Sequence, residues 1–475
     1  MAPAQDSRLE SSLAANALSG YILLPGCSGK PAWLNQNRMS STSELASFAA
    51  RLREFILLSK WGAAPSLNSH PSAGETDFEA LALRLFALQF KHNGPYRRLC
   101  EARGARPGTG ARWTDIPAAP TSAFKEFDLS CLPVAERTTV FYSSGTTGQT
   151  PSRHYHNAAS LAVYEASALA WFEAHFQLPI ANCQSDETKA APGGKLGMGD
   201  CQLAILTPPP AQAPHSSLVH MFETIRRECG SGGSTLHAQN GGLLSLPLSS
   251  RRGQGNGAAA IEHRDAYKYL SGNSPFVGTA AEEGAWTLDT AAALARITTA
   301  SRSGRALLML GTAFSFVHLL DYMAEQDLLL ELPPGSCALE TGGYKGRSRS
   351  LPKAVLHALI SERLGIPPGH IVCEYGMSEL SSQAYDCINS PSRITHPASR
   401  IFHFPPWARV QIISPETGRE VAEGETGLIR VFDLANVYSV MAIQTEDLGI
   451  RCGNGFALAG RAVLAEPRGC SLLAV

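Results

Sequence analysis

The chain has 475 residues, and its 40 lysines and arginines balance 41 aspartates and glutamates to a formal net charge of −1. Without a basic block or an acidic tail, nucleic acid is excluded as a partner and a disordered charged tail is not expected. No apolar run approaches the roughly 18 residues of a membrane span. The eleven cysteines lack zinc-ligand spacing, so we expect reduced thiols in a cytoplasmic protein.

Two regions are expected along the chain. Residues 1–75 form an N-terminal extension, partly disordered or helical, with one short helical segment at 43–61. An apolar stretch at 18–27 is too short, and lacks the basic leader, for an export signal. Residues 76–475 form the main domain, interrupted by loose inserts at 183–199 and 229–259 that are poor in regular hydrophobic spacing.

Within the main domain, segments with helical and strand-like patterns alternate. A helix is predicted through Phe90 from the spacing of its apolar residues, and short apolar runs that end in turn residues predict buried strands. The expected helices are 77–90, 314–330 and 353–364, and the expected strands are 204–207, 306–311, 371–373, 410–413 and 427–431. The last two strands flank a turn and should pair antiparallel. The pattern indicates an α/β fold with a β-rich C-terminal section.

A loop rich in hydroxyl groups, residues 142–151 with the sequence YSSGTTGQTP, follows a β-branched and aromatic run. A strand that opens into such a loop lets backbone N–H groups converge on an anion. Gln149 stands where a Walker A loop needs lysine, so hydroxyl groups would grip the phosphate instead. Taken alone, the loop is equally an ordinary linker. Arg153 adds positive charge or, like His154, is a surface polar residue.

Three more short motifs follow downstream: ETGGYKG at 340–346, EYGMSEL at 374–380 and TEDLG at 445–449. Paired glycines let a flat group approach the backbone closely, a tyrosine ring stacks on a base, and carboxylates bind Mg²⁺ or ribose hydroxyls. Each motif alone is also explained as a plain turn, a buried tyrosine or a solvated glutamate. Together the four are far more specific than any one of them.

The order SSGTTG, GG, YGMSE, TEDLG resembles the adenylate-forming superfamily of acyl- and aryl-CoA ligases, luciferases and peptide-synthetase adenylation domains. Residues 338–386, with ETGGYKGRSR and EYGMSELSSQAYD, resemble the acyl-protein synthetase (LuxE-type) family more closely. That family supplies fatty acyl groups to the reductase of bacterial bioluminescence. The resemblance covers roughly residues 77–475. It implies an α/β domain of mixed sheets flanked by helices, with the small mobile C-terminal domain reduced or absent.

The resemblance implies an ATP-dependent ligase that uses Mg²⁺ and converts a carboxylic acid, here a fatty acid, into an acyl-adenylate and pyrophosphate. The phosphate-binding residues would be Ser143, Ser144, Gly145, Thr146, Thr147 and Gly148. Glu379 would hold the metal and act in catalysis. The rest of the nucleotide would meet Gly342 and Gly343 at the adenine, Tyr375 stacked on it, Ser378 at the α-phosphate, and Asp447 with Arg461 at the ribose.

Two steps of the implied reaction lack an obvious residue. Because 28 residues follow Asp447, we expect no full C-terminal domain carrying the superfamily's catalytic lysine. Lys345 is the first candidate to replace that lysine and Lys125 the second, although either is equally a surface lysine. The implied acyl-accepting thiol is Cys470, beside Arg468, which favours its thiolate. The alternative is an unremarkable tail thiol.

Other functions remain open at this point. The chain is alternatively an acyl- or aryl-CoA ligase of the phenylacetate-CoA ligase type, in which CoA takes the acyl group. In the acyl-protein synthetase reading the final acceptor is a partner protein, a reductase or a carrier. A third alternative is a non-catalytic scaffold that binds nucleotide. A role in light production rests on family analogy alone.

Overall fold

The computed structural model describes residues 41–58, 74–108, 112–143, 150–181, 201–230, 274–280, 286–343, 349–386 and 400–462. The chain divides into two units, Met1–Ser40 and Ser41–Val475, and all described residues belong to the second. The loop residues Ser144 to Gly148, Lys345, Cys470 and nearly all of the two inserts lie outside the described residues.

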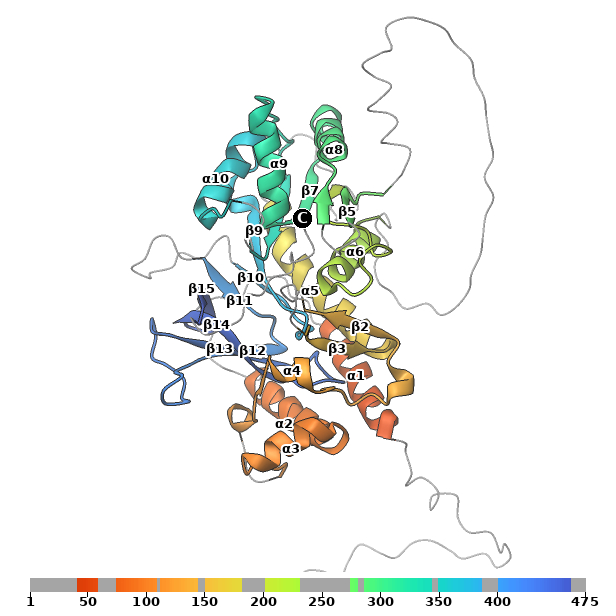
Figure 1. Ribbon diagram of the computed structural model, residues 1–475, viewed down its shortest axis with the longest axis vertical. Helices are drawn as coiled ribbons and strands as arrows, with labels where there is room; N and C mark the ends of the chain where they lie inside the picture. Colours follow the sequence, from red (N-terminus) through yellow and green to blue (C-terminus); the bar gives the residue numbers. More distant parts are fainter. Residues whose placement is uncertain are drawn as a thin grey trace, which may run out of the picture. The chain divides into compact units, whose positions relative to one another are not determined.

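A mixed sheet runs through this unit in the order β12-β13-β14-β15-β11-β10-β9-β8-β7-β4 (Figure 1). The segment β4-β7-β8-β9 is parallel, and from β9 to β12 every pair is antiparallel. β1 (Ala119–Pro120) adds to β14 in parallel. The other strands are β4 (Gln202–Ile205), β7 (Leu307–Thr312), β8 (Cys337–Thr341), β9 (Ile371–Tyr375), β10 (Ala384–Asp386), β11 (Ile401–His403), β12 (Ala408–Ile413), β13 (Thr426–Asp433), β14 (Ala442–Cys452) and β15 (Gly455–Arg461).

Two small hairpins stand apart from this sheet. β2 (Thr139–Tyr142) pairs antiparallel with β3 (Arg153–His156), and β5 (Gly278–Ala280) pairs with β6 (Trp286–Leu288). The β2–β3 hairpin carries the hydroxyl-rich loop at its turn, so the predicted strand before that loop is present.

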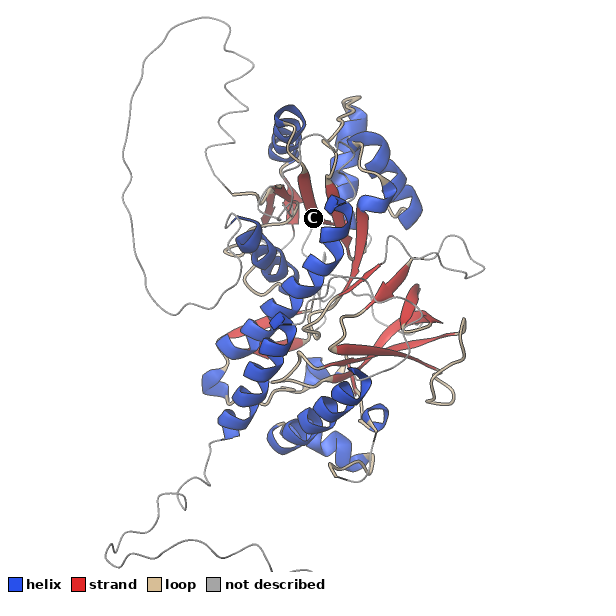
Figure 2. Cartoon of the chain, turned by 180° about the vertical axis from the view of Figure 1, so that it is seen from behind, coloured by secondary structure: helices blue, strands red, loops and turns tan. Residues whose placement is uncertain are grey.

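Helices cover both faces of the parallel strands, and each strand alternates its side chains between them. On β7, Leu308 and Leu310 belong to the core that includes Phe172 and Phe222 of α5 and α6, whereas Met309 belongs to the core under α8, α9 and α10. Figure 2 shows the long helix α5 lying along the strands. The helices are α1 (Ser41–Leu58), α2 (Gly74–His92), α3 (Gly94–Ala102), α4 (Ala123–Glu126), α5 (Ala158–Ala181), α6 (Ser217–Gly230), α8 (Thr290–Ser303), α9 (Ala313–Glu325) and α10 (Lys353–Leu364), with short 3₁₀ turns at Trp113–Asp115, Val134–Glu136 and Pro368–His370.

The expected α/β class with a β-rich C-terminal section is confirmed, and so is the antiparallel pairing of β12 with β13. The helix expected at 353–364 has those bounds and ends at Gly365, whose φ of 69° suits glycine. The helix expected at 314–330 was predicted too long. It ends at Glu325, because Asp327 takes a left-handed φ of 50° and Leu328 N–H donates back to Met323 O.

Gln89 of α2 and Asn93, just after that helix, form hydrogen bonds with residues 436–441 near the other end of this unit. The Gln89 amide donates to Asn436 O at 2.7 Å and accepts from Met441 N at 3.0 Å. Asn93 Nδ2 donates to Ser439 O at 3.2 Å. Both side chains are fully buried, so these bonds satisfy backbone groups that would otherwise be buried without partners.

Candidate active site

The carboxyl ends of β8 and β9 lie side by side, because the two strands are parallel neighbours with Thr341 opposite Glu374. Gly342 follows β8 with a φ of 74°, a conformation that glycine adopts without strain. An added Cβ at Gly342 or Gly343 would meet nothing within 4 Å. Two of the predicted motifs therefore meet at one edge of the sheet, which is where ligands bind in open α/β sheets.

The TEDLG motif reaches the same edge through a contact with Tyr375, the last residue of β9. The Tyr375 phenol donates to Asp447 Oδ2 at 2.9 Å, across 72 residues of sequence. Asp447 lies on β14 opposite Arg461 of β15, and Arg461 Nε approaches its other oxygen at 3.2 Å. A carboxylate offers about four acceptor positions, which is the chemistry that ribose hydroxyls require. The structure thus brings together three residues that the sequence assigned to one nucleotide.

Ser378 and Glu379 follow Tyr375 in a turn. Ser378 Oγ donates to Glu379 Oε2 at 3.0 Å, and the Glu379 backbone carbonyl accepts from Asn436 Nδ2 at 2.9 Å. Glu379 is 1% exposed, so it is not a solvated surface glutamate. A buried carboxylate beside a hydroxyl is an oxygen donor set of the kind that Mg²⁺ shares with substrate phosphates. These residues fit the metal, which would neutralise phosphate charge there.

His154 of β3 joins the hydroxyl-rich hairpin to this turn, since its Nδ1 lies 2.8 Å from Ser378 O. Its side chain is buried, and burial lowers its pKa to about 4, so the imidazole is neutral and donates through Nδ1. The reading of His154 as surface polarity was wrong. The sequence signal that was overlooked is the alternation of β3, in which His154 and His156 share the buried face.

Ser143 directly follows β2 in the hydroxyl-rich loop and is the only one of the loop's predicted phosphate ligands among the described residues. Its N–H donates to Ser152 O at 3.1 Å and its Oγ accepts from Ser152 N at 2.8 Å, which closes the base of the loop. Among the described residues, no acceptor is bonded to the Ser143 hydroxyl proton, which can therefore be donated to an anion. Arg153 adjoins this base, and its guanidinium donates to Lys125 O at 3.2 Å. Lys125 and Arg153 therefore both lie next to the loop.

Asp433, at the end of β13, anchors the chain that follows the EYGMSE motif. It is fully buried. Burial raises its pKa, whereas the surrounding hydrogen bonds lower it. Its carboxylate accepts four hydrogen bonds: from Ser381 N at 2.8 Å, Ser382 N at 2.8 Å, Ser382 Oγ at 2.7 Å and Ala435 N at 3.0 Å. These bonds fix the turn that carries Ser378 and Glu379 to the antiparallel part of the sheet.

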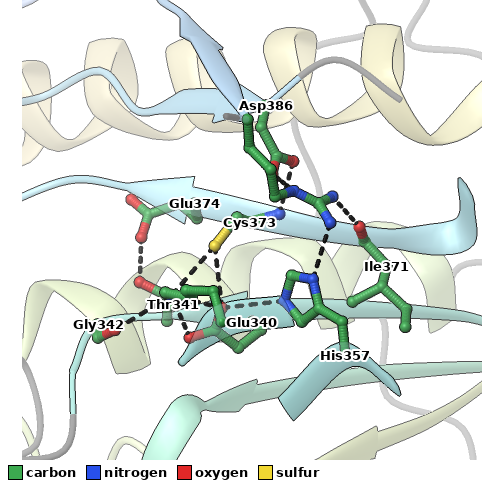
Figure 3. A network of polar contacts seen from close by, with 10 residues as sticks. Glu340, Thr341, Gly342, His357, Ile371, Cys373, Glu374 and Asp386 are labelled. Atoms are coloured by element: carbon green, nitrogen blue, oxygen red, sulfur yellow. Dashed lines mark hydrogen bonds and ion pairs between the residues drawn. The ribbon is translucent and has the colours of Figure 1, made fainter. Parts of the chain in front are cut away.

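A second charged group lies beneath the glycine pair, on the α10 face of the sheet (Figure 3). Lys353 Nζ approaches the two Glu340 carboxylate oxygens at 2.6 and 2.5 Å, Cys373 Sγ at 3.1 Å and Gly342 O at 3.4 Å. Burial alone would raise the pKa of Glu340, but the Lys353 charge and the hydrogen bonds outweigh it and hold that pKa at about 2. The ion pair thus holds the turn after β8 in place.

The side chains of Glu340, His357 and Cys373 are grouped closely enough to bind a metal ion. The hydrogen-bonding of these side chains, however, is not that of metal ligands. Arg400 Nη1 donates to His357 Nδ1 at 2.8 Å, so Nδ1 is the acceptor and Nε2 carries the proton. That Nε2 faces Glu340 Oε2 at 3.5 Å. With His357 Nε2 protonated and the Lys353 ammonium already neutralising Glu340, this group is an ion-pair network and not a metal centre.

Glu374 is the residue of this region to which the sequence assigned no role, although it stands within EYGMSEL. It is 7% exposed, and burial raises its pKa to about 7 despite a hydrogen bond from Thr341 Oγ1 to its Oε2. Its other oxygen lies so close to Gly376 that a Cβ there would collide with it. The available signal was a glutamate directly after the apolar run 371–373, which the structure extends into β9.

No protein-family model matches the chain, and no curated protein matches it. Among solved structures, it is similar to a 2-hydroxyisobutyryl-CoA ligase in the postadenylation state, at 13% identity over 86% of this chain and 74% of that one, with a TM-score of 0.48. A luciferase-like enzyme from the mealworm Zophobas morio shares 12% identity over 75% and 65%, with a TM-score of 0.38. An anthranilate CoA ligase in complex with anthranoyl-AMP shares 15% over 68% and 46%, with a TM-score of 0.33. Since these TM-scores lie below 0.5, a functional proposal must rest on the chain's own residues.

Across the described part of the chain, none of the helices is both long and apolar enough to span a membrane.

Proposed function

We propose that the protein is an AMP-forming ligase that activates a carboxylic acid with ATP and passes the acyl group to a thiol. The observation that carries this proposal is the contact of Tyr375 with Asp447, with Arg461 on the other carboxylate oxygen. These residues come from separate motifs, and the fold joins them beside the Gly342–Gly343 turn. A chance set of turns would have no reason to converge at the carboxyl end of the parallel strands.

In the first half-reaction the acid's carboxylate attacks the α-phosphorus of ATP, and pyrophosphate leaves. Tyr375 would stack on the adenine and Asp447 would accept from the ribose, which orients the nucleotide. Once Mg²⁺ occupies the Glu379 carboxylate, the Ser378 hydroxyl would turn its proton from Glu379 Oε2 to the α-phosphate, and Glu379 would hold the metal against the charge that develops there. Ser143, the hydroxyl loop and Arg153 would hold the leaving phosphates. The lysine that completes the charge stabilisation is Lys345, with Lys125 as the second candidate.

The acid is a fatty acid in this proposal, and the thiol is Cys470, from which the acyl group would move to a reductase or carrier protein. The support is the resemblance of residues 338–386 to acyl-protein synthetases. The thiolate of Cys470 would attack the acyl carbon and release AMP, which needs no further co-reactant.

The proposal is tested by ATP–pyrophosphate exchange across a panel of carboxylic acids. We expect exchange that depends on both acid and Mg²⁺, and at least about a hundredfold loss in Asp447→Ala, as the loss of a positioning group implies. Arg451→Ala, on the same strand but paired with Glu420 and Glu423, is the matched control and should retain exchange. No exchange with any acid would refute the proposal.

The acceptor is tested separately. Incubation of the protein with ATP and a radiolabelled fatty acid should label the wild type covalently and leave Cys470→Ser unlabelled. Equal labelling of Cys470→Ser would remove that residue from the mechanism. Faster AMP release on addition of CoA, with no covalent label, would make the protein a CoA ligase instead.

A further inference from the structure

A row of buried polar side chains crosses the sheet one residue before the proposed nucleotide-binding positions. Thr341 pairs with Glu374, Glu374 with Tyr385, and Tyr385 with His403. Residues paired directly across neighbouring strands point to the same face, so these four share one face. All four are at most 7% exposed. Buried polar rows are unusual in a sheet whose central strands are otherwise apolar.

Helix α5 covers this face. The ring of His175 lies 5.1 Å from that of Tyr385, and Trp171 Nε1 donates to His403 O at 3.2 Å. The ion-pair network of Glu340, Lys353 and Cys373 lies on the opposite face, under α10. The Lys353 ammonium therefore does not share the face on which Glu374 lies, although the charges of Lys353 and Glu340 still act on the Glu374 pKa in opposite directions.

Three members of the row lack partners that buried polar groups require: Tyr385, Glu374 and His403, whose Nδ1 has no hydrogen-bond partner among the described residues. The Tyr385 hydroxyl is fully buried and has no hydrogen-bond partner among the described residues. Within the described part of the chain, Glu374 receives one hydrogen bond, from Thr341, and forms no ion pair. An unsatisfied buried hydroxyl alone costs about 1–3 kcal/mol. A stable fold most readily retains a buried polar group without a partner where a bound ligand supplies the missing hydrogen bond.

The chemistry of the unmet groups identifies what would relieve it. In its ionised form the Glu374 carboxylate only accepts hydrogen bonds, whereas a phenol with a free hydroxyl proton donates one. A hydroxyl group is complementary to both, since it donates to Glu374 and accepts from Tyr385. An ammonium satisfies Glu374 alone, because it cannot accept, and an alkyl chain satisfies neither.

We propose that Glu374 and Tyr385 bind a hydroxyl group of the acid, so that the preferred substrate is a hydroxy carboxylic acid. This inference rests on the proposed function, because it assigns the row to the acyl half of the adenylation site. Glu374 immediately precedes Tyr375, and Thr341 immediately precedes Gly342, so the row adjoins the nucleotide on two neighbouring strands. Sites that hydrogen-bond a substrate hydroxyl discriminate strongly against analogues without it.

The test is ATP–pyrophosphate exchange with matched acids. The chain length that exchanges fastest among unsubstituted fatty acids is compared with its 2-, 3- and terminal-hydroxy derivatives. We expect kcat/KM for at least one hydroxy isomer to exceed that of the parent acid by about tenfold or more. Glu374→Gln and Tyr385→Phe should each reduce this ratio to within about threefold, mainly by slowing exchange with the hydroxy acid.

Tyr322→Phe on α9 is the matched control and should leave the ratio unchanged. Tyr385→Phe should also be at least as stable as the wild type to heat, because it removes a buried hydroxyl without a partner. A parent acid used as well as every hydroxy isomer would overturn the inference, as would an unchanged ratio in both variants. A less stable Tyr385→Phe with an unchanged ratio would show that a bound water satisfies the hydroxyl, and would overturn it too. Absence of exchange with any acid would instead refute the proposed function.

Discussion

The raised pKa of Glu374 predicts a pH-dependent change in the stability of the protein, which can be measured without any substrate. Glu374→Gln keeps the shape of the side chain and an oxygen that accepts from Thr341, but it removes the charge. In the folded protein, burial raises the Glu374 pKa from 4.5 to about 7. The folded state therefore binds this proton more tightly than the unfolded state. The resulting stabilisation is fully present below pH 4.5 and is lost as the pH rises through about 7.

The size of the effect follows from the two pKa values. A rise of about 2.5 corresponds to about 3 kcal/mol, at about 1.4 kcal/mol for each tenfold change in proton affinity. About 2–3 kcal/mol of this falls between pH 5 and pH 8. The glutamine variant has no such titration, so its stability relative to the wild type should increase by that amount over the same interval. For a unit of this size we expect the difference in Tm to change by about 2–3 °C.

The assay is thermal unfolding of the wild type and Glu374→Gln at half-unit steps from pH 5 to pH 8. Glu340→Gln is the control, because Glu340 has a pKa of about 2 when folded. The stability contributed by the ionised Glu340 carboxylate is present above the unfolded pKa of glutamate and is lost only as the pH falls toward 2. Glu340→Gln should therefore lower Tm by a constant amount between pH 5 and pH 8. Parallel curves for the wild type and Glu374→Gln would refute the reasoning about Glu374.

Three other substitutions have defined outcomes. Tyr375→Phe removes the hydrogen bond to Asp447 and should raise the KM for ATP in pyrophosphate exchange about five- to tenfold, which corresponds to the loss of about one hydrogen bond. An unchanged KM would mean that Asp447 does not need the hydrogen bond from Tyr375. Gly376→Ala brings a methyl group against the Glu374 carboxylate and should cut exchange with the parent acid at least about tenfold, and Glu374→Ala in the same chain should restore part of it if that collision is the cause. Asp433→Ala removes the acceptor of four hydrogen bonds and should destabilise the protein by about 3–5 kcal/mol, measured by urea unfolding, where a loss under about 1 kcal/mol would contradict its anchoring role.

Much of the fold was predictable from local pattern. The helix that becomes α10 carries its stop signal, Gly365, in the sequence, and the strands β7 and β9 are apolar runs of the length that buried parallel strands have. The end of α9 was missed because the residue that stops it is Asp327, which takes a left-handed φ that aspartate adopts only occasionally. Local propensity does not reveal that choice.

The candidate site was predictable as motifs but not as an arrangement. The sequence contains Tyr375 and Asp447, yet only the sheet order β14-β15-β11-β10-β9 shows which strands separate these two contacting residues. The buried row through Glu374 and Tyr385 could not be predicted from the sequence for the same reason, because cross-strand register is set by tertiary structure. The ion pair of Glu340 with Lys353 likewise needs α10 to lie over β8.

The bonds from Gln89 and Asn93 to residues 436–441 bear on how the protein is made. A ribosome that has released α2 must synthesise about 350 more residues before those carbonyl and amide partners exist, at about 5–20 residues per second. During those tens of seconds, two polar side chains destined for full burial and the apolar face of α2 have no native surface to pack against. Contacts of such long sequence separation also slow folding. The nascent chain is thus exposed to misassembly for much of its synthesis, and substitutions at Gln89 should reduce the yield of folded protein more than the activity of the molecules that do fold.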